Sequence, residues 1–245
     1  MSDKTHGKPS KEMIVFKQCK INDFDAMITE TLEAMDKVLN QREKDLKTWG
    51  NKEKNEFHTI FGIWGDEFVH INMPVRGEQH LVKISAKGVM EDCIRRIRYV
   101  ESTMTIKSFI NKINEPREVS AKVPGEPQKD YKVEIGINFV GRRKKDSNEK
   151  KRICSKLTGH DSRVSTLCHE LSHIPKFFTD PNGGGMGTSD YDSEGNKQSP
   201  YQEDNDDYNG HVKGANKLIT ENKFDLVFDN AYNIERYFEI EIKNE

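Results

Sequence analysis

The residues with the clearest capacity for chemistry lie in the segment Ser165–His173, whose sequence is Ser-Thr-Leu-Cys-His-Glu-Leu-Ser-His. On a helix, His169 and His173 would lie one turn apart on the same face, where both imidazoles can bind a single zinc ion. Glu170 would lie beside a water held by that metal. Zinc lowers the pKa of such a water toward about 7, and a carboxylate can accept its proton as the water attacks a carbonyl carbon. The segment therefore predicts a hydrolytic zinc site.

The flanking residues predict that this segment is a helix with one buried side. Asp161 and Ser162 supply a candidate N-cap, and Pro175 would stop or bend the helix just past the metal. Val164 and Leu167 can bury the opposite face. The alternative, a surface helix with two incidental histidines, is disfavoured by this cap and by the strand expected before the segment.

Two histidines require a third protein ligand, with water in the fourth position. The metzincin extension would place Gly at 176 and His at 179, whereas this chain has Lys176 and Thr179, so that class is excluded. The remaining candidates are acidic residues of the long loop 181–210 and beyond: Glu194, Glu203, Glu221, Asp190, Asp204, Asp206 and Asp207. The aspartates are the stronger group, and a loop of that length within a domain is usually functional.

Length and composition narrow the class of protein. The chain has 245 residues, of which 33% are hydrophobic and 33% charged, and we expect a flexible lead over 1–20 followed by a single domain over 21–245. The net charge of −2 gives no reason to expect that the chain binds nucleic acid. The chain also has no apolar run of about 18 residues, so we expect no membrane-spanning helix. The polar start MSDKTHGKPSKEM does not resemble a secretory signal peptide, so we expect synthesis in the cytoplasm.

The four cysteines form no CxxC pair and are expected to be free thiols, unless the protein is exported.

The apolar pattern predicts the elements that must position the site. A helix should begin at Asn22 or Asp23 and break over 40–54, and a second helical stretch should run over 81–110 with Met90, Ile94, Ile97 and Met104 on its inner face. Strict alternation predicts a strand over 131–140, and 215–242 has helical spacing. The basic run 141–152 is interpreted as a solvated loop. The fold class is therefore α+β, with N-terminal helices, a small sheet and an active-site helix.

Several segments, taken in chain order, resemble the deuterolysin and peptidyl-Lys metallopeptidase family, the aspzincins. They are Thr166–His173, Gly187–Asp190, Tyr208–Gly210, Asn230–Ala231 and Tyr237–Phe238, with looser similarity at Trp49-Gly50 and Phe61-Gly62. The resemblance implies a zincin-like fold, one catalytic zinc ion (Zn2+) and endopeptidase activity on a protein or peptide substrate.

Residue by residue, the resemblance assigns His169 and His173 as zinc ligands and Glu170 as the general base. Asp190 matches the third ligand of the family's G-T-x-D motif. The tyrosine expected three positions later is Ser193 here, so either Tyr208 supplies the phenol that stabilises the oxyanion, or the aspartate–tyrosine pair has moved to Asp207–Tyr208.

The specificity residues also depart from the family pattern. The aspartate of the family's N-A-D segment is Tyr232 here, while Glu235 matches a nearby carboxylate. Both are candidates for substrate binding. In lysine-specific members the acids receive the ammonium group of the substrate, so a preference for lysine is not implied for this chain.

Three other functions remain open at this point. The zinc could brace a non-catalytic binding protein, or the acidic loop could bind calcium or a partner. The run Asp190-x-Asp192-x-Glu194-Gly195 begins like an EF-hand, but position twelve is Tyr201 rather than Glu, which argues against one. An endopeptidase without a signal peptide also suggests a toxin or effector, exported by a signal-independent secretion machinery and paired with an immunity protein.

Overall fold

The computed structural model describes residues 24–75, 78–115, 119–124, 131–143, 152–177, 183–199 and 208–242. Its first element is the long helix α2 (Phe24–Thr48), whose buried positions recur every three or four residues from Met27 to Leu46. The expected break at Asn40 is wrong. The helix continues because Arg42, a charged residue in the apolar stripe, is itself buried and is satisfied by Glu56 and by the carbonyl of Tyr237. The expected start at Asn22 or Asp23 and the lead 1–20 lie outside the described residues.

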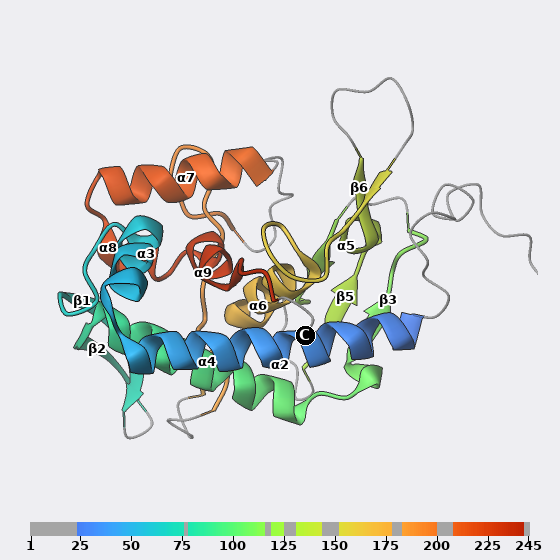
Figure 1. Ribbon diagram of the computed structural model, residues 1–245, viewed down its shortest axis with the longest axis horizontal. Helices are drawn as coiled ribbons and strands as arrows, with labels where there is room; N and C mark the ends of the chain where they lie inside the picture. Colours follow the sequence, from blue (N-terminus) through green and yellow to red (C-terminus); the bar gives the residue numbers. More distant parts are fainter. Residues whose placement is uncertain are drawn as a thin grey trace, which may run out of the picture.

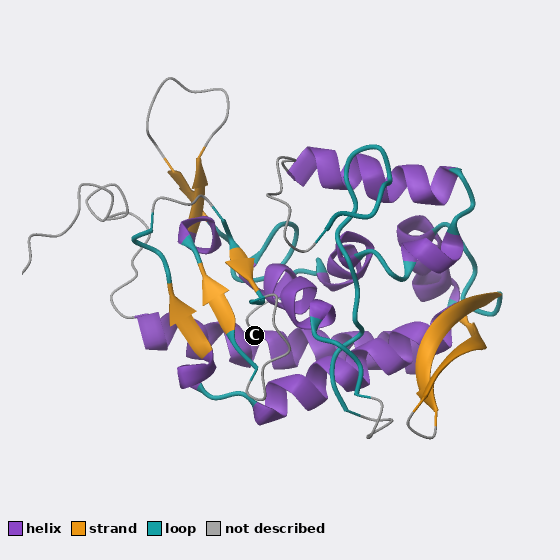
Figure 2. Ribbon diagram, turned by 180° about the vertical axis from the view of Figure 1, so that it is seen from behind, coloured by secondary structure: helices purple, strands orange, loops and turns teal. Residues whose placement is uncertain are grey.

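The elements of residues 51–85 form one end of the molecule, and the helix that follows runs from this end alongside α2 (Figures 1 and 2). Helix α3 (Asn51–Phe61) is followed by an antiparallel ribbon of β1 (Phe68–Val75) and β2 (Glu78–Ser85), and then by α4 (Ala86–Thr103). The helix expected over 81–110 is therefore wrong over 81–85 and again over 104–110, where the chain leaves the helix at Met104 and enters a 3-10 turn and a strand. Ser85 ends the strand and caps α4, accepting a 3.1 Å hydrogen bond from the backbone N–H of Gly88. Met90, Ile94 and Ile97 are buried as expected, and Met104 packs against the core from a half-buried position.

The opposite end holds the small sheets (Figure 2). The 3-10 turn η2 (Ile106–Ser108) leads into β3 (Phe109–Asn111). The central strand of this sheet is β5 (Val133–Ile135). It pairs in parallel with β3 on one side and antiparallel with β4 (Ala121–Lys122) on the other. The strand expected over 131–140 is wrong beyond Ile135, because α5 (Ile137–Val140) follows. At the junction, Gly136 passes so close to the Val119 carbonyl oxygen that a Cβ would lie 2.3 Å from it.

The ribbon of β6 (Gly141–Arg143) and β7 (Arg152–Cys154) brackets the basic run, most of which lies outside the described residues. Cys93 and Cys168 are free and buried, as expected, and burial raises the pKa of both thiols, which leaves them inert. Cys154 is disulfide-bonded, so the expectation of free thiols is wrong there. That expectation was based on the reducing cytoplasm in which the chain was predicted to be made. The spacing of the cysteines in the sequence did not indicate a disulfide.

The remaining helices enclose the centre of the molecule: α6 (Arg163–His173), α7 (Tyr208–Thr220), α8 (Phe224–Val227) and α9 (Ala231–Phe238). In Figure 1, α6 lies behind α2 and next to α9, and α6 also contacts α4 and β4. The α+β class expected for a zincin-like chain is confirmed, with N-terminal helices, small sheets and a helix that carries H-E-x-x-H. Among the described residues, no helix is both long and apolar enough to cross a membrane.

Candidate metal centre

Helix α6 holds both histidines in a rigid, buried setting. Ser162 caps its first turn, and its Oγ accepts a 3.2 Å hydrogen bond from the backbone N–H of Ser165. Val164, Leu167 and Leu171 are fully buried along the helix. The helix ends at His173, immediately before Ile174 and Pro175. The predicted helix, its cap and its stop are therefore confirmed.

A glycine-rich segment returns along the end of α6 and brings the acidic loop to the histidines. The N–H groups of Met186 and Thr188 both donate to the carbonyl of Ser172, at 3.2 and 3.1 Å. A Cβ at Gly185 would lie 2.4 Å from the carbonyl oxygen of Ile174, so only glycine permits this approach. Gly184 also has a positive φ of 75°. This backbone contact places Asp190 over the C-terminal turn of α6.

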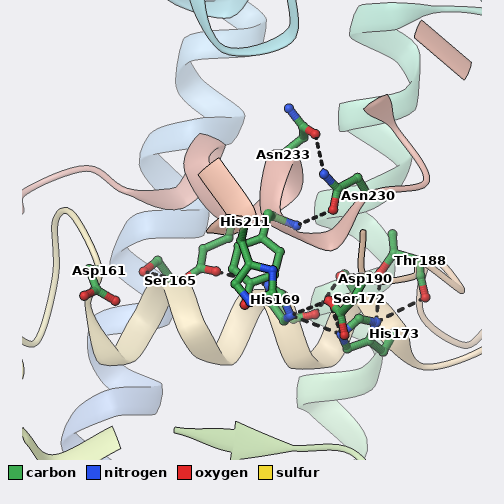
Figure 3. Close-up of polar contacts among 12 residues, drawn as sticks. Asp161, Ser165, His169, Ser172, His173, Thr188, Asp190, His211, Asn230 and Asn233 are labelled. Atoms are coloured by element: carbon green, nitrogen blue, oxygen red, sulfur yellow. Dashed lines mark hydrogen bonds and ion pairs between the residues drawn. The ribbon is translucent and has the colours of Figure 1, made fainter. Parts of the chain in front are cut away.

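Three ligand atoms meet at this point. His169 Nε2 lies 3.1 Å from His173 Nε2 and 3.2 Å from Asp190 Oδ1, and His173 Nε2 lies 3.4 Å from the same oxygen. Figure 3 shows the three side chains converging beside the end of α6. Donor atoms about 2.0 Å from a tetrahedral zinc ion lie about 3.3 Å from one another. His169, His173 and Asp190 thus form a group that could hold one metal ion.

The protonation of the two imidazoles favours a cation between them. The outer nitrogen of His173, Nδ1, lies 3.1 Å from the carbonyl oxygen of Thr188, and a proton there leaves Nε2 with a lone pair. The outer nitrogen of His169, Nδ1, lies 3.1 Å from a carboxylate oxygen of Glu235, an ion-pair contact without hydrogen-bond geometry, and the negative charge there favours a proton on this nitrogen. Asp190 Oδ1, the third atom, is buried without a hydrogen-bond partner. With the inner protons removed, three lone pairs would face one another, an arrangement that a divalent cation stabilises.

The electrostatics of the site point the same way. Burial alone would lower the pKa of His169, but the carboxylates of Asp190 and Glu235 raise it well above its usual value. Burial alone would raise the pKa of Asp190, but the two histidines hold it well below its usual range. In the described part of the chain, no Lys or Arg forms an ion pair with Asp190, Glu235 or Glu170. The cationic partners of these carboxylates are the two histidines, whose raised pKa values favour the imidazolium form. A divalent cation between the same atoms would replace the inner protons and balance the same negative charge.

Glu170 lies next to the ligand atoms on α6. It is buried, and this burial raises the pKa of its carboxyl group, an effect that the neighbouring His169 and His173 oppose. Its Oε2 accepts a 3.0 Å hydrogen bond from the backbone N–H of Val123, just after β4. This contact fixes the carboxylate between helix and sheet, and sequence reasoning did not anticipate it because Val123 has no distinctive pattern around it.

The site is open on the side of Asp190. The Asp190 side chain is 34% exposed and that of His173 is 18% exposed, whereas that of His169 is only 7% exposed. A metal ion held by the three residues would therefore have a free coordination position toward solvent. This openness is typical of catalytic rather than structural zinc sites.

The remaining predicted site residues are placed as follows. Tyr208 begins α7, but its side chain and the alternative ligand Asp207 lie outside the described residues. Tyr232 lies edge-on to His169, with ring centroids 4.5 Å apart, and stacks on His211 at 3.8 Å. His211 is buried beside Tyr232 and was missed by sequence reasoning, because it belongs to no motif.

Two glutamates that were candidate ligands are paired elsewhere. Glu194 forms ion pairs with Lys213 and Lys217, and Glu221 forms one with Lys223, so neither takes part in the site.

Glu235, which was predicted to bind substrate, lies beside the candidate metal centre. Its side chain is 4% exposed and lies behind His169, on the side of the imidazole opposite Asp190. The cause is the position of α9, which packs along α6 and directs Glu235 at the helix rather than at solvent. In this arrangement the carboxylate faces His169 and is almost completely shielded from solvent.

A solved structure, a zinc peptidase from Grifola frondosa, is similar to this chain. The two are 19% identical, and the alignment covers 88% of this chain and 93% of that chain with a TM-score of 0.49. No protein-family model matches the chain, and no curated protein matches it.

Proposed function

We propose that this protein is a zinc-dependent endopeptidase that uses His169, His173 and Asp190 as metal ligands. The observation that carries the proposal is the triangle of three ligand atoms 3.1 to 3.4 Å apart, open to solvent on one side and flanked by the carboxylate of Glu170. Only small readjustments would bring all three atoms to the bond lengths of zinc. His/His/carboxylate sites with a free position occur in hydrolytic zinc enzymes, and the H-E-x-x-H spacing on one helix, with its glutamate beside the metal, is typical of zinc peptidases.

The residues of the chain then have distinct roles. Zinc in this site would supply an activated water and an electrophile for the peptide carbonyl. Glu170 accepts the proton of the attacking water and passes it to the leaving amine, and its raised pKa suits both steps. The Val123 N–H holds this carboxylate in place. Tyr208 is the proposed donor to the oxyanion that forms when water adds to the carbonyl.

The test measures zinc and proteolysis together. Purified wild-type protein should contain about one zinc per chain and digest an unfolded protein substrate such as casein. Glu170→Gln should retain its zinc while losing about 100- to 10,000-fold in rate. Absence of zinc binding, or digestion by Glu170→Gln at the wild-type rate, would refute the proposal. Global unfolding on chelation, with no effect of Glu170→Gln, would instead identify a zinc-braced binding protein.

We further propose that the protein acts outside the cytoplasm that makes it, as an exported toxin or effector. The disulfide at Cys154 supports this, because disulfides persist in oxidising compartments. An immunity protein and a dedicated secretion machinery would be its partners in the producing cell. If the proposal is right, cytosolic expression of the wild type in a heterologous cell slows growth and expression of Glu170→Gln does not. Equal growth would contradict it.

A further inference from the structure

Glu235 and His169 form a contact that connects the last helix to the metal centre. Glu235 Oε2 lies 3.1 Å from His169 Nδ1, while the other ring nitrogen of His169 faces Asp190 Oδ1 at 3.2 Å. The imidazole thus lies between two carboxylates, and its two nitrogens have separate functions. His173 differs, because its outer nitrogen contacts a neutral backbone carbonyl, that of Thr188.

The carboxylate of Glu235 is held in place by its surroundings. Its second oxygen, Oε1, accepts a 3.4 Å hydrogen bond from Ser165 Oγ, one turn before His169 on the same helix. Helix α9 is fixed at its start by Asn230, whose side chain accepts from the Tyr232 N–H, and at its end by Arg42, which donates to the carbonyl of Tyr237. Glu235 therefore has little freedom to turn away from His169.

We propose that Glu235 is a positioning residue that fixes the tautomer and orientation of His169 and so strengthens metal binding. This inference rests on the proposed zinc site. A carboxylate behind a ligating imidazole keeps the proton on the outer nitrogen and makes the inner nitrogen a better electron donor. Glu235 also adds a negative charge behind the ligating imidazole, which favours a divalent cation on its other side.

The experiment compares metal affinity among three proteins: the wild type, Glu235→Gln and Glu239→Gln. Glu239 is a matched control, since it lies at the end of the same helix but contacts the Asp161 N–H rather than the metal centre. Zinc affinity is measured by competition with a chromophoric chelator, and the cobalt-substituted proteins are compared by visible absorption. Both readouts are independent of proteolysis, and the melting temperature of each metal-free protein reports on folding.

Glu235→Gln should bind zinc about 10- to 100-fold more weakly and alter the cobalt spectrum, whereas Glu239→Gln should match the wild type in both. If the wild type binds zinc and Glu235→Gln binds it equally well, the positioning role is refuted while the proposed function stands. If the wild type binds no zinc, the proposed function itself fails. Should Glu235→Gln not fold, Glu235→Asp takes its place: its shorter carboxylate must also weaken zinc binding, and wild-type affinity would overturn the inference.

Discussion

Arg96 and Gly183 are joined by a 2.7 Å hydrogen bond from the guanidinium Nη1 to the backbone carbonyl, across 87 positions of the chain. Arg96 is completely buried in α4, and its Nε also donates to Asp92 Oδ2 at 2.7 Å. Gly183 begins the described part of the segment that leads to Asp190. This one side chain therefore ties α4 to the loop that supplies the third ligand atom.

Replacing Arg96 should destabilise the whole protein. Arg96→Met leaves the buried carboxylate of Asp92 without its buried partner, and breaking such a pair costs about 3 to 5 kcal/mol. Urea unfolding of the metal-free protein measures the loss. Arg95→Met is the control, because Arg95 contacts the same aspartate but is 40% exposed, and its loss should cost under about 1 kcal/mol. Equal effects of the two substitutions would contradict this account of Arg96.

The third ligand can be assigned by comparing two aspartates. Asp190→Ala removes the oxygen that faces both histidines and should abolish stoichiometric zinc binding at micromolar protein, measured by elemental analysis after desalting. Asp207→Ala should leave the zinc content unchanged. The reverse result would move the ligand to Asp207 and refute the proposed triangle.

Specificity should differ from that of lysine-selective enzymes. Glu235 is covered by His169 and Tyr232 carries no charge, so neither of these residues offers a carboxylate to a substrate ammonium group. We expect no strong preference for lysine in a peptide library. Tyr232→Asp, which adds an acid beside the metal centre, should raise the ratio of kcat/KM for lysine over alanine peptides by up to about tenfold, corresponding to about 1.4 kcal/mol. An unchanged ratio would show that Tyr232 does not face the substrate.

Stability should depend on pH through Glu101. Burial, reinforced by the nearby Asp36 and opposed by Arg98, raises the pKa of Glu101 from 4.5 to about 7. The folded state therefore binds this proton more tightly than the unfolded state. The stabilisation is complete below about pH 4.5 and is lost as the pH rises to about 7. The difference in melting temperature between Glu101→Gln and wild type should grow in favour of the variant over this range, and a constant difference would contradict the assignment.

The sequence was most informative where a function depends on local spacing. The histidines of α6 are one helical turn apart, and their helix, cap and stop follow from nearby residues. Asp190 was also favoured, because Gly187-Thr188 before it fits the G-T-x-D motif of the family that the sequence resembles. Predictions failed where residues distant in the sequence determine the local structure. The side chain of Arg42 is buried within α2 because it contacts Glu56 and the carbonyl of Tyr237, and the sequence around Arg42 does not indicate these contacts.

The strand over 78–85, where a helix was predicted from residue 81, and the position of Glu235 could not be predicted for related reasons. Alternation in Glu78–Ser85 is weak because most of its side chains are exposed, so pairing with β1 determines its conformation. Glu235 has the same sequence neighbours whether it faces substrate or His169. Only the packing of α9 on α6 distinguishes the two, and that packing depends on the tertiary structure.

The loop of Asp190 is attached to the start of α9 by two backbone hydrogen bonds, from Ser189 N–H to the Asp229 carbonyl at 2.7 Å and from Ala231 N–H to the Ser189 carbonyl at 3.0 Å. The candidate metal centre therefore depends on Asp229 and Ala231, at the start of α9. This helix is the last of the described elements to be synthesised. A nascent chain that ends before residue 229 has both histidines but lacks the backbone that holds Asp190, and it also lacks Glu235. If the proposed function holds, hydrolytic activity would thus arise only after translation has passed α9.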